Sequence, residues 1–402
     1  MTPDVVVAGG GPAGLSAARE TAAAGLATVV LEKGAAIGVP LRTSGASWID
    51  ELDALDVPRR FHVPIRRIRV IGPRAEAAFD FPEPRMCILD VRAFYQWLAQ
   101  RALEAGAQLR LDARADDLLL RDGRAAGVRV RARNGRAETL PARIVVDATG
   151  YASTLARRLG LHAGFAAFGV GAELDLYAPR FDAHEALLIV GGRVAPCGYG
   201  WAFPYGDGRV RLGVGVGRPH ADADPHAFLD AVRARVPALR TLDGASPIEA
   251  HTGLIPLVAP RSVPLVRDGL VAVGDAAGQA SSLVGEGIRY AMHAGRLAGR
   301  AVAQALRDGG VDAAALDAYP REWARRERNL RFAHEIYRRI VRYDDADWDR
   351  EIDHLTRLAP DPFAQGLKGD FTLAWLLRVV PCYSGMLVPE RYRDGDGRFA
   401  RG

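Results

Sequence analysis

The fold is decided by the stretch Val5-Val6-Val7-Ala8-Gly9-Gly10-Gly11-Pro12-Ala13-Gly14, near the start of the chain. Its first four residues have the length and branching of a buried parallel strand. The helix formers that follow, residues 15–24, end at Gly25 and predict a helix. The glycines therefore lie between a strand and the helix after it, where a GxGxxG dinucleotide motif is found.

Each residue of this turn has a physical task in such a site. Gly9 permits the tight turn, Gly11 lets the backbone approach a pyrophosphate, and Gly14 lets helix and strand pack closely. The helix begins at Pro12 and Ala13, and its N-terminus offers free N–H groups and a partial positive charge to phosphates.

A second apolar run, Thr28-Val29-Val30-Leu31, ends in Glu32. An acidic side chain about twenty residues after the glycine turn accepts hydrogen bonds from a ribose diol and repels a 2′-phosphate. The site is therefore expected to take FAD or NAD rather than NADP. The alternative is a glycine-rich turn without a ligand, and the complete strand, helix, strand and Glu pattern argues against it.

Composition sets the limits of the other function classes. The 402 residues are 49% hydrophobic and 25% charged, with a net charge of +5, which suits a globular protein of two or three domains. No basic run is interleaved with aromatic residues, so no nucleic-acid partner is expected. The odd number of distant cysteines, Cys87, Cys197 and Cys382, predicts neither a disulfide framework nor a metal site.

The chain begins directly with the first strand, and no apolar run has the length of a membrane span. We therefore expect a cytoplasmic protein, with peripheral contact as its one way of meeting a membrane.

Periodicity predicts the organisation of the rest of the chain. We expect a helix over residues 90–104 that is capped by Asp90. Runs at 108–111, 117–121, 126–133 and 137–140 predict an antiparallel meander, because Asp122-Gly123 and Asn134-Gly135 are hairpin signals. Residues 143–150 return to a buried strand, residues 165–255 are β-rich around a helix at 225–236, and residues 312 onward are helical and rich in Arg.

Three motifs together resemble a known group of proteins. The N-terminal turn, the middle strand that ends at Gly150, and Gly274-Asp275-Ala276-Ala277-Gly278 are similar in order and distance to FAD-dependent oxidoreductases of the p-hydroxybenzoate hydroxylase-like group. The resemblance implies that Asp275 bonds the ribityl chain and that Arg92 reaches the cofactor. It also implies that the helix opened by Gly285-Glu286-Gly287-Ile288 points its N–H groups at the electron-rich end of the flavin.

A sharper match lies further along the chain. Tyr199-Gly200-Trp201-Ala202-Phe203-Pro204, followed by Gly213-Val214-Gly215, resembles the YxWxFP…GxG signature of the geranylgeranyl reductase family. In that family the segment lines a tunnel for a polyprenyl chain, and three aromatic side chains on one strand suit an apolar wall. The alternative, that these side chains are ordinary core, is weaker for the set than for any one of them.

The resemblance implies an α/β (α+β) fold of three parts. A Rossmann-like FAD-binding domain comprises residues 1–75, 86–160 and 265–310. A β-rich substrate domain of antiparallel sheet comprises residues 76–85 and 161–264, and a C-terminal helical region comprises residues 311–402.

The expected site residues follow from these motifs. For the cofactor they are Gly9, Gly11, Pro12, Ala13, Gly14, Glu32, Lys33, Arg42, Thr43, Arg92, Gly150, Gly274, Asp275, Gly285, Gly287 and Ile288. For the substrate they are Ser44, Tyr199, Trp201, Phe203 and Pro204.

The implied reaction is the saturation of C=C bonds in a geranylgeranyl-type chain, by hydride transfer from reduced flavin N5 and protonation of the other carbon. We expect Tyr199 or His251 to donate the proton, although a structural histidine at a strand edge is the more common explanation of His251. Electrons are expected from NAD(P)H or from a partner reductase protein, since no second nucleotide fold is evident.

Alternatives stay open at this point. A flavin-dependent monooxygenase or halogenase acting on an aromatic compound shares the fold, although Asp147-Ala148-Thr149-Gly150 departs from the hydroxylase pattern and the halogenase Trp-x-Trp-x-Ile-Pro motif is absent. An electron-transfer flavoprotein is disfavoured because no iron–sulfur set of cysteines occurs. Some archaeal reductases carry a Cys where this chain has Thr43-Ser44, so no mechanism through a thiol is expected there. The sequence does not select the isoprenoid or the number of bonds reduced.

Overall fold

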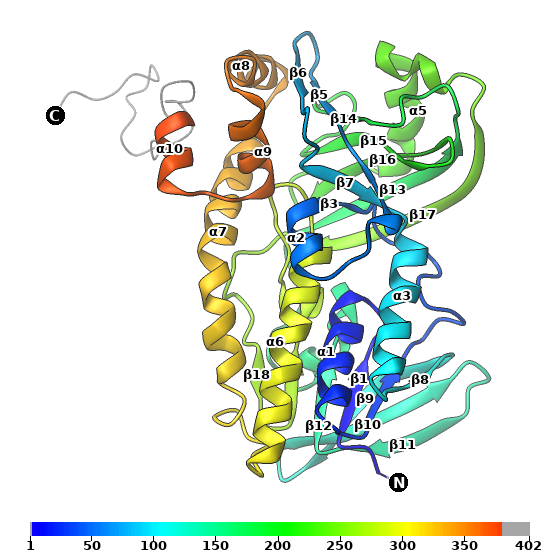
Figure 1. The fold of residues 1–402 in the computed structure, drawn as a ribbon, viewed down its shortest axis with the longest axis vertical. Coiled ribbons are helices and arrows are strands. Elements are labelled where there is room, and N and C mark those ends of the chain that lie inside the picture. Colours follow the sequence, from blue (N-terminus) through cyan, green and yellow to red (C-terminus); the bar gives the residue numbers. More distant parts are fainter. Residues whose placement is uncertain (1, 380–402) are drawn as a thin grey trace, which may run out of the picture.

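The computed structural model describes residues 2–379 of the chain, so Cys382 and the end of the predicted tail lie outside the described residues. Figure 1 shows two β-sheet regions, one above the other, with a column of long helices along one side. The lower region contains the glycine turn, and the upper region contains the strand with the aromatic signature.

The lower region is built on a six-stranded sheet in the order β18-β19-β12-β1-β2-β8. Its strands are β18 (Val266–Arg267), β19 (Leu270–Ala272), β12 (Ile144–Asp147), β1 (Val5–Ala8), β2 (Thr28–Leu31) and β8 (Gln108–Arg110). All neighbours pair in parallel except β18 and β19. Helices cover this sheet, which is why β1 and β2 are continuous apolar runs with every residue buried.

The antiparallel meander is smaller than the sequence predicts. It contains β9 (Ala113–Arg121), β10 (Arg124–Ala132) and β11 (Ala137–Pro141), with the two predicted hairpin turns between them. The prediction that residues 108–111 belong to it is wrong, because β8 pairs in parallel with β2. The physical reason is that β8 follows a crossover helix, α3 (Val91–Glu104), and such a strand returns parallel to the sheet edge.

Two helices fix the geometry of the glycine turn. Helix α1 (Pro12–Ala23) follows the turn, and α6 (Ile288–Arg307) packs on α1 (Figure 1). A Cβ atom on Gly295 of α6 would lie 2.2 Å from the carbonyl oxygen of Ala13, so only glycine permits this approach. The predicted cap of α3 is confirmed, since the Asp90 side chain accepts a hydrogen bond from the N–H of Ala93.

The upper region is a seven-stranded sheet in the order β17-β13-β16-β15-β14-β5-β6. Its strands are β17 (Ser246–Pro256), β13 (Phe168–Tyr177), β16 (Arg209–Arg218), β15 (Gly198–Gly206), β14 (Glu185–Ile189), β5 (Arg67–Ile71) and β6 (Glu76–Asp80). Only β14 and β5 pair in parallel. Strand β5 lies inside residues 1–75, which were predicted to belong to the FAD-binding domain, yet it pairs with this sheet. The segment from Arg67 therefore packs with the β-rich part, and the division into domains stays a prediction.

Each face of the large sheet buries a core. Helix α5 (Pro225–Arg235), as predicted, covers one face together with the 3₁₀ turn η3 (Pro237–Leu242). The other face packs on a small sheet in the order β3-β7-β4, made of β3 (Ala46–Trp48), β7 (Met86–Leu89) and β4 (His62–Pro64). Short helices complete the loops: α2 (Ile49–Ala54), η1 (Arg59–Phe61), η2 (Gly150–Ala152), α4 (Thr154–Arg158) and η4 (Gly274–Ala277).

The C-terminal region is helical, as predicted. Helix α7 (Ala318–Ile340) packs on α6, and α8 (Asp345–Leu355) lies beside β6. Helix α10 (Leu373–Val379) packs on α9 (Pro360–Lys368), on the side away from β5 and β6 in Figure 1. Within residues 2–379, no helix combines the length and the hydropathy that crossing a bilayer requires.

Candidate functional site

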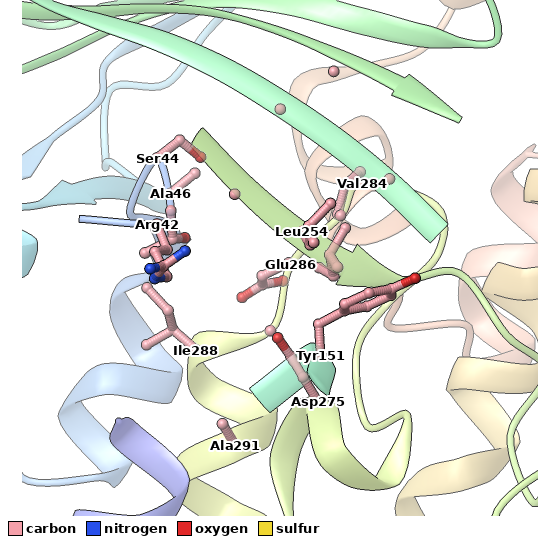
Figure 2. A pocket seen from close by; sticks show the side chains of 18 of the residues that line it. Arg42, Ser44, Ala46, Tyr151, Leu254, Asp275, Val284, Glu286, Ile288 and Ala291 are labelled. Atoms are coloured by element: carbon pink, nitrogen blue, oxygen red, sulfur yellow. The ribbon is translucent and has the colours of Figure 1, made fainter. Parts of the chain in front are cut away.

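One large cavity joins the two sheet regions and the C-terminal helices. It has a volume of about 920 Å³. Its walls come from the glycine turn, residues 38–44, the turns before α6, six strands of the large sheet, and helices α7 to α10. Figure 2 shows Arg42 and Ser44 on one side of it, Tyr151 and Val284 on the other, and Asp275 between them.

The glycine turn forms a cradle at one end of the cavity. A Cβ on Gly9, which has φ +117°, would lie 2.1 Å from the Ala148 carbonyl oxygen, and one on Gly14 would lie 2.1 Å from the Gly9 carbonyl oxygen. A Cβ on Gly11 would meet nothing within 4 Å, so its surface is open toward the cavity. Gly11 is also the N-cap of α1 and places no side chain over the helix end. The cradle fits the pyrophosphate of a dinucleotide.

Glu32 is held rigidly beside this cradle. Its Oε2 accepts a hydrogen bond of 2.9 Å from the N–H of Gly10, and its Oε1 accepts one of 2.7 Å from the N–H of Gly34. The carboxylate lines the cavity and keeps acceptor capacity for the two hydroxyls of a ribose. Lys33 is next to it, and burial together with the nearby Arg42 lowers the pKa of its ammonium group.

A second cradle lies at the start of α6. Gly287 is the N-cap of α6 and makes no side-chain cap, and Gly285 adopts φ +60° in front of it. Asp275 on η4 is half-buried at the same place, and desolvation raises the pKa of its carboxyl group to about 6. A helix N-terminus aimed into the cavity favours an electron-rich ring, and the carboxyl group beside it suits a polyol chain.

Most of the predicted cofactor residues meet at these two cradles. Those that line the cavity are Gly9, Gly11, Pro12, Ala13, Glu32, Lys33, Arg42, Thr43, Gly150, Gly274, Asp275, Gly285, Gly287 and Ile288. Gly14 instead packs α1 against β1, as its expected task requires. Arg92 is not in the lining; it forms a 2.8 Å ion pair with Glu249 of β17, and its contact with the cofactor stays a prediction.

The aromatic signature forms a wall on one face of β15. Tyr199, Trp201 and Phe203 all line the cavity, with ring centroids 5.4 Å and 6.3 Å apart along the strand. Pro204 does not line it, because successive side chains of a strand point to opposite faces. A Cβ on Gly213 of the neighbouring strand would lie 2.3 Å from the ring of Trp201. The GxG half of the signature therefore makes room for the tryptophan.

The two predicted proton donors have different places. The Tyr199 hydroxyl faces the cavity wall, donates a hydrogen bond of 2.6 Å to the Val284 carbonyl oxygen, and has its pKa raised by burial. His251 is buried and does not line the cavity. Its Nδ1 lies 3.1 Å from Oε2 of Glu173, and its Nε2 lies 3.4 Å from Oδ1 of Asp175.

A buried charge cluster, made of Glu173, Asp175, Arg211 and His251, explains the position of the histidine. Arg211 donates to both carboxylate oxygens of Asp175, at 2.7 and 3.2 Å. Glu173 lines the cavity, whereas the other three members do not. Glu173 is not among the residues predicted from the sequence; acidic residues at alternate positions of a buried strand mark it as unusual, but its partner His251 follows only from the strand register.

The far end of the cavity lies among the C-terminal helices and is mostly apolar. Its lining there includes Ile336, Ile340, Val341, Leu355, Phe363, Leu367, Phe371, Trp375 and Val379. One carboxyl group interrupts this surface, that of Glu351 on α8, and burial raises its pKa to about 7. Within residues 2–379, no group of three His, Cys, Asp or Glu side chains is placed to hold a metal ion.

Comparison with known proteins agrees with this geometry. A family model described as lycopene cyclase protein matches residues 4–352. Digeranylgeranylglycerophospholipid reductase 2 of Methanothermobacter thermautotrophicus is 33% identical over 369 residues, which are 89% of this chain and 91% of that protein. The chain belongs to the geranylgeranyl reductase family. A second member, digeranylgeranylglycerophospholipid reductase 1 of Methanopyrus kandleri, is 32% identical over 85% of this chain and 90% of its own.

Solved structures confirm the fold of this family for the chain. A geranylgeranyl bacteriochlorophyll reductase-like protein from Thermoplasma acidophilum superimposes with a TM-score of 0.83 at 24% identity, over 96% of this chain and 98% of its own. A flavin-dependent brominase superimposes less closely, with a TM-score of 0.68 at 20% identity over 92% of this chain and 94% of its own. The resemblance to FAD-dependent oxidoreductases of the geranylgeranyl reductase family is therefore confirmed.

Proposed function

We propose that the protein is an FAD-dependent reductase that saturates C=C bonds in the polyprenyl chain of a geranylgeranyl-bearing lipid. The observation that carries this proposal is the continuity of the cavity. The two glycine cradles, the aromatic wall and the apolar lining of the C-terminal helices all belong to one space of about 920 Å³. The names of the relatives, which are digeranylgeranylglycerophospholipid reductases, support the substrate class.

The residues at the cradles divide the binding of FAD among them. The N–H groups at the start of α1 would hold the pyrophosphate, Glu32 a ribose and Asp275 the ribityl chain. The N-terminus of α6 would face the pyrimidine end of the flavin ring. When bound and reduced, FAD supplies the hydride for the reaction.

The apolar part of the cavity prepares the other reactant. An unactivated alkene is a weak hydride acceptor, so its second carbon must receive a proton as the hydride arrives. Tyr199, Trp201 and Phe203 exclude water along the wall, and Phe363 of α9 stacks on Phe79 of β6 beyond them. A long flexible chain fits such a continuous apolar lining, whereas a compact aromatic substrate would leave the far end unfilled.

The lipid is proposed to reach the cavity from a membrane surface. Helix α10 places Trp375 and Val379 in the cavity wall, while Leu373 and Leu377 on its outer side are 74% and 69% exposed. Two exposed leucines four residues apart support peripheral contact of this helix with lipid. Electrons are proposed to come from NAD(P)H or a partner reductase, and the cytoplasmic location stays a prediction.

The proposal is tested with the chemically reduced holoenzyme in the absence of oxygen. A geranylgeranyl-bearing glycerophospholipid is added, the products are followed by mass spectrometry, and the flavin is followed by absorbance. We expect the lipid to gain two hydrogens for each flavin that is reoxidised. A flavin that stays reduced until oxygen enters, with no change in lipid mass, would overturn the proposal in favour of oxygen chemistry.

A further inference from the structure

One carboxyl group of the buried charge cluster reaches the cavity. The side chain of Glu173 is 6% exposed, and its Oε2 has no hydrogen-bond donor in the described structure apart from the contact with His251. Trp201 and Tyr199 of the aromatic wall line the cavity around it; the charge of Glu173 raises the pKa of Tyr199, and the indole of Trp201 lowers that of Glu173. Glu173 therefore stands where the alkene of a bound prenyl chain would pass.

The geometry of the cluster requires a proton between Glu173 and His251. Burial raises the pKa of Asp175, but hydrogen bonds from His251 and Arg211 outweigh it and hold that pKa below the ordinary value. Asp175 is therefore ionised, and His251 Nε2, 3.4 Å from it, keeps a hydrogen. His251 Nδ1 and Glu173 Oε2 are 3.1 Å apart, and two bare lone pairs repel at that distance.

The charge count leads to the same result. With that proton, the net charge of the cluster of Arg211, Asp175, His251 and Glu173 is zero. Without it, the cluster carries one net negative charge, although each of its side chains is at most 6% exposed. The groups that face the Glu173 carboxyl are Arg211 from β16, His251 from β17 and the indole of Trp201 from β15, and Asp175 lies on β13 with Glu173. Burial, opposed by Arg211 and His251, raises the pKa of Glu173 to about 7.

We propose that Glu173 donates the proton to the alkene, and that His251 and Asp175 position its carboxyl group. This inference rests on the proposed function. One alkene carbon receives the hydride and its electron pair from reduced FAD, and the electron pair of the C=C bond takes the proton of Glu173 at the other carbon. The O–H bond of Glu173 breaks, its carboxylate keeps the electron pair and one negative charge, and it takes a new proton from solvent water after the product leaves the cavity.

The same contacts disfavour the two donors expected from the sequence. Burial and the nearby charge of Glu173 raise the pKa of the Tyr199 hydroxyl above its ordinary value, so Tyr199 is a much weaker acid than Glu173, whose pKa is about 7. His251 does not line the cavity, so it acts through Glu173.

The test is the substitution Glu173→Gln in the full-length holoenzyme, compared with Glu351→Gln. Glutamine keeps the size and neutrality of a protonated Glu173 but has no acidic proton for carbon. We expect kcat for prenyl reduction to fall about 100- to 10,000-fold, with FAD content unchanged and KM altered far less. Glu351 is the matched control because it lines the same cavity and burial also raises its pKa to about 7.

The pH profile distinguishes a proton donor from a structural residue. Since the acid form is required, kcat of the wild type should fall as pH rises through about 7. Glu173→Gln should lose this descending limb, and Glu351→Gln should keep it. A second measurement needs no turnover: the infrared carbonyl band of protonated carboxyl groups, followed from about pH 5 to about pH 9 in the substrate-free protein. Glu173→Gln should remove a component that titrates near 7.

Three outcomes would overturn the inference. If Glu173→Gln reduces the lipid at the wild-type kcat and keeps the descending limb, Glu173 is not the donor, although the proposed function stands. If Tyr199→Phe removes turnover while Glu173→Gln does not, the donor is Tyr199. If the wild type reduces no prenyl chain with reduced flavin, the proposed function fails and this inference fails with it.

Discussion

Adding a methyl group to Gly11 or to Gly14 of the N-terminal turn should impair different properties of the protein, FAD binding at Gly11 and stability at Gly14. Gly11 has nothing within 4 Å of an added Cβ, whereas a Cβ on Gly14 would lie 2.1 Å from the Gly9 carbonyl oxygen. Neither glycine has a positive φ, so the difference between Gly11→Ala and Gly14→Ala comes from space alone. In Gly11→Ala the methyl group occupies the volume proposed for the pyrophosphate. In Gly14→Ala it separates α1 from β1.

The magnitudes follow from these contacts. Gly11→Ala should change the unfolding free energy of the FAD-free protein by less than about 0.5 kcal/mol, because it meets no protein atom. Losing one or two charge-assisted hydrogen bonds to phosphate, about 1.5–3 kcal/mol each, should raise the Kd for FAD at least tenfold. Gly14→Ala should cost about 1–3 kcal/mol of stability by overpacking, before any FAD is added.

The assay is urea unfolding of both variants without FAD, followed by titration with FAD monitored by flavin fluorescence. The reasoning is refuted if Gly11→Ala binds FAD as tightly as the wild type, since the pyrophosphate then lies elsewhere. It is also refuted if Gly11→Ala destabilises the FAD-free protein as much as Gly14→Ala does.

Three further predictions concern the rest of the cavity. Arg211→Met leaves the buried carboxylate of Asp175 without its cation and should lower the unfolding free energy by about 3–5 kcal/mol; a loss under about 1 kcal/mol in urea unfolding would contradict this. The unfolding free energy of the wild type should fall as the pH rises from about 4.5 to 7, because the folded state keeps a proton on Glu351 that the unfolded chain releases. In Glu351→Gln this fall should be smaller by about 3 kcal/mol. Gly213→Ala displaces the ring of Trp201 and should lower prenyl turnover at unchanged FAD absorbance, whereas Gly200→Ala, whose added Cβ has only ordinary contacts, should not.

Local patterns allowed much of the fold to be predicted from the sequence. The strand, glycine turn and helix at the N-terminus are set by neighbours in the chain, and so is the cap of α3 at Asp90. The period of two along β15 likewise places Tyr199, Trp201 and Phe203 on one face without knowledge of the partner strands.

The features that the sequence did not predict depend on pairing between segments that are far apart in the chain. β8 was assigned to the meander because its edge partner β2 lies far from it in sequence. The ion pair of Arg92 with Glu249 could not be foreseen because the two residues are 157 positions apart, and the contact of Arg92 with the cofactor stays a prediction. Glu173 was missed because its significance arises from the register of β13 with β17, which sets it opposite His251. No local periodicity encodes such a register.

The hydrogen bond from Tyr199 to Val284 fixes the position of the aromatic wall relative to the cradle at the start of α6. Tyr199 belongs to the aromatic wall on β15, and Val284 directly precedes Gly285 at the start of the α6 cradle. The aromatic wall proposed to contact the prenyl chain is thus hydrogen-bonded to the backbone proposed to face the flavin ring. Because hydride transfer requires the two reactants in near contact, this tie matters for reactivity as well as for binding. The role of the Tyr199 hydroxyl is then positional, which leaves the proton to Glu173 beside the aromatic wall.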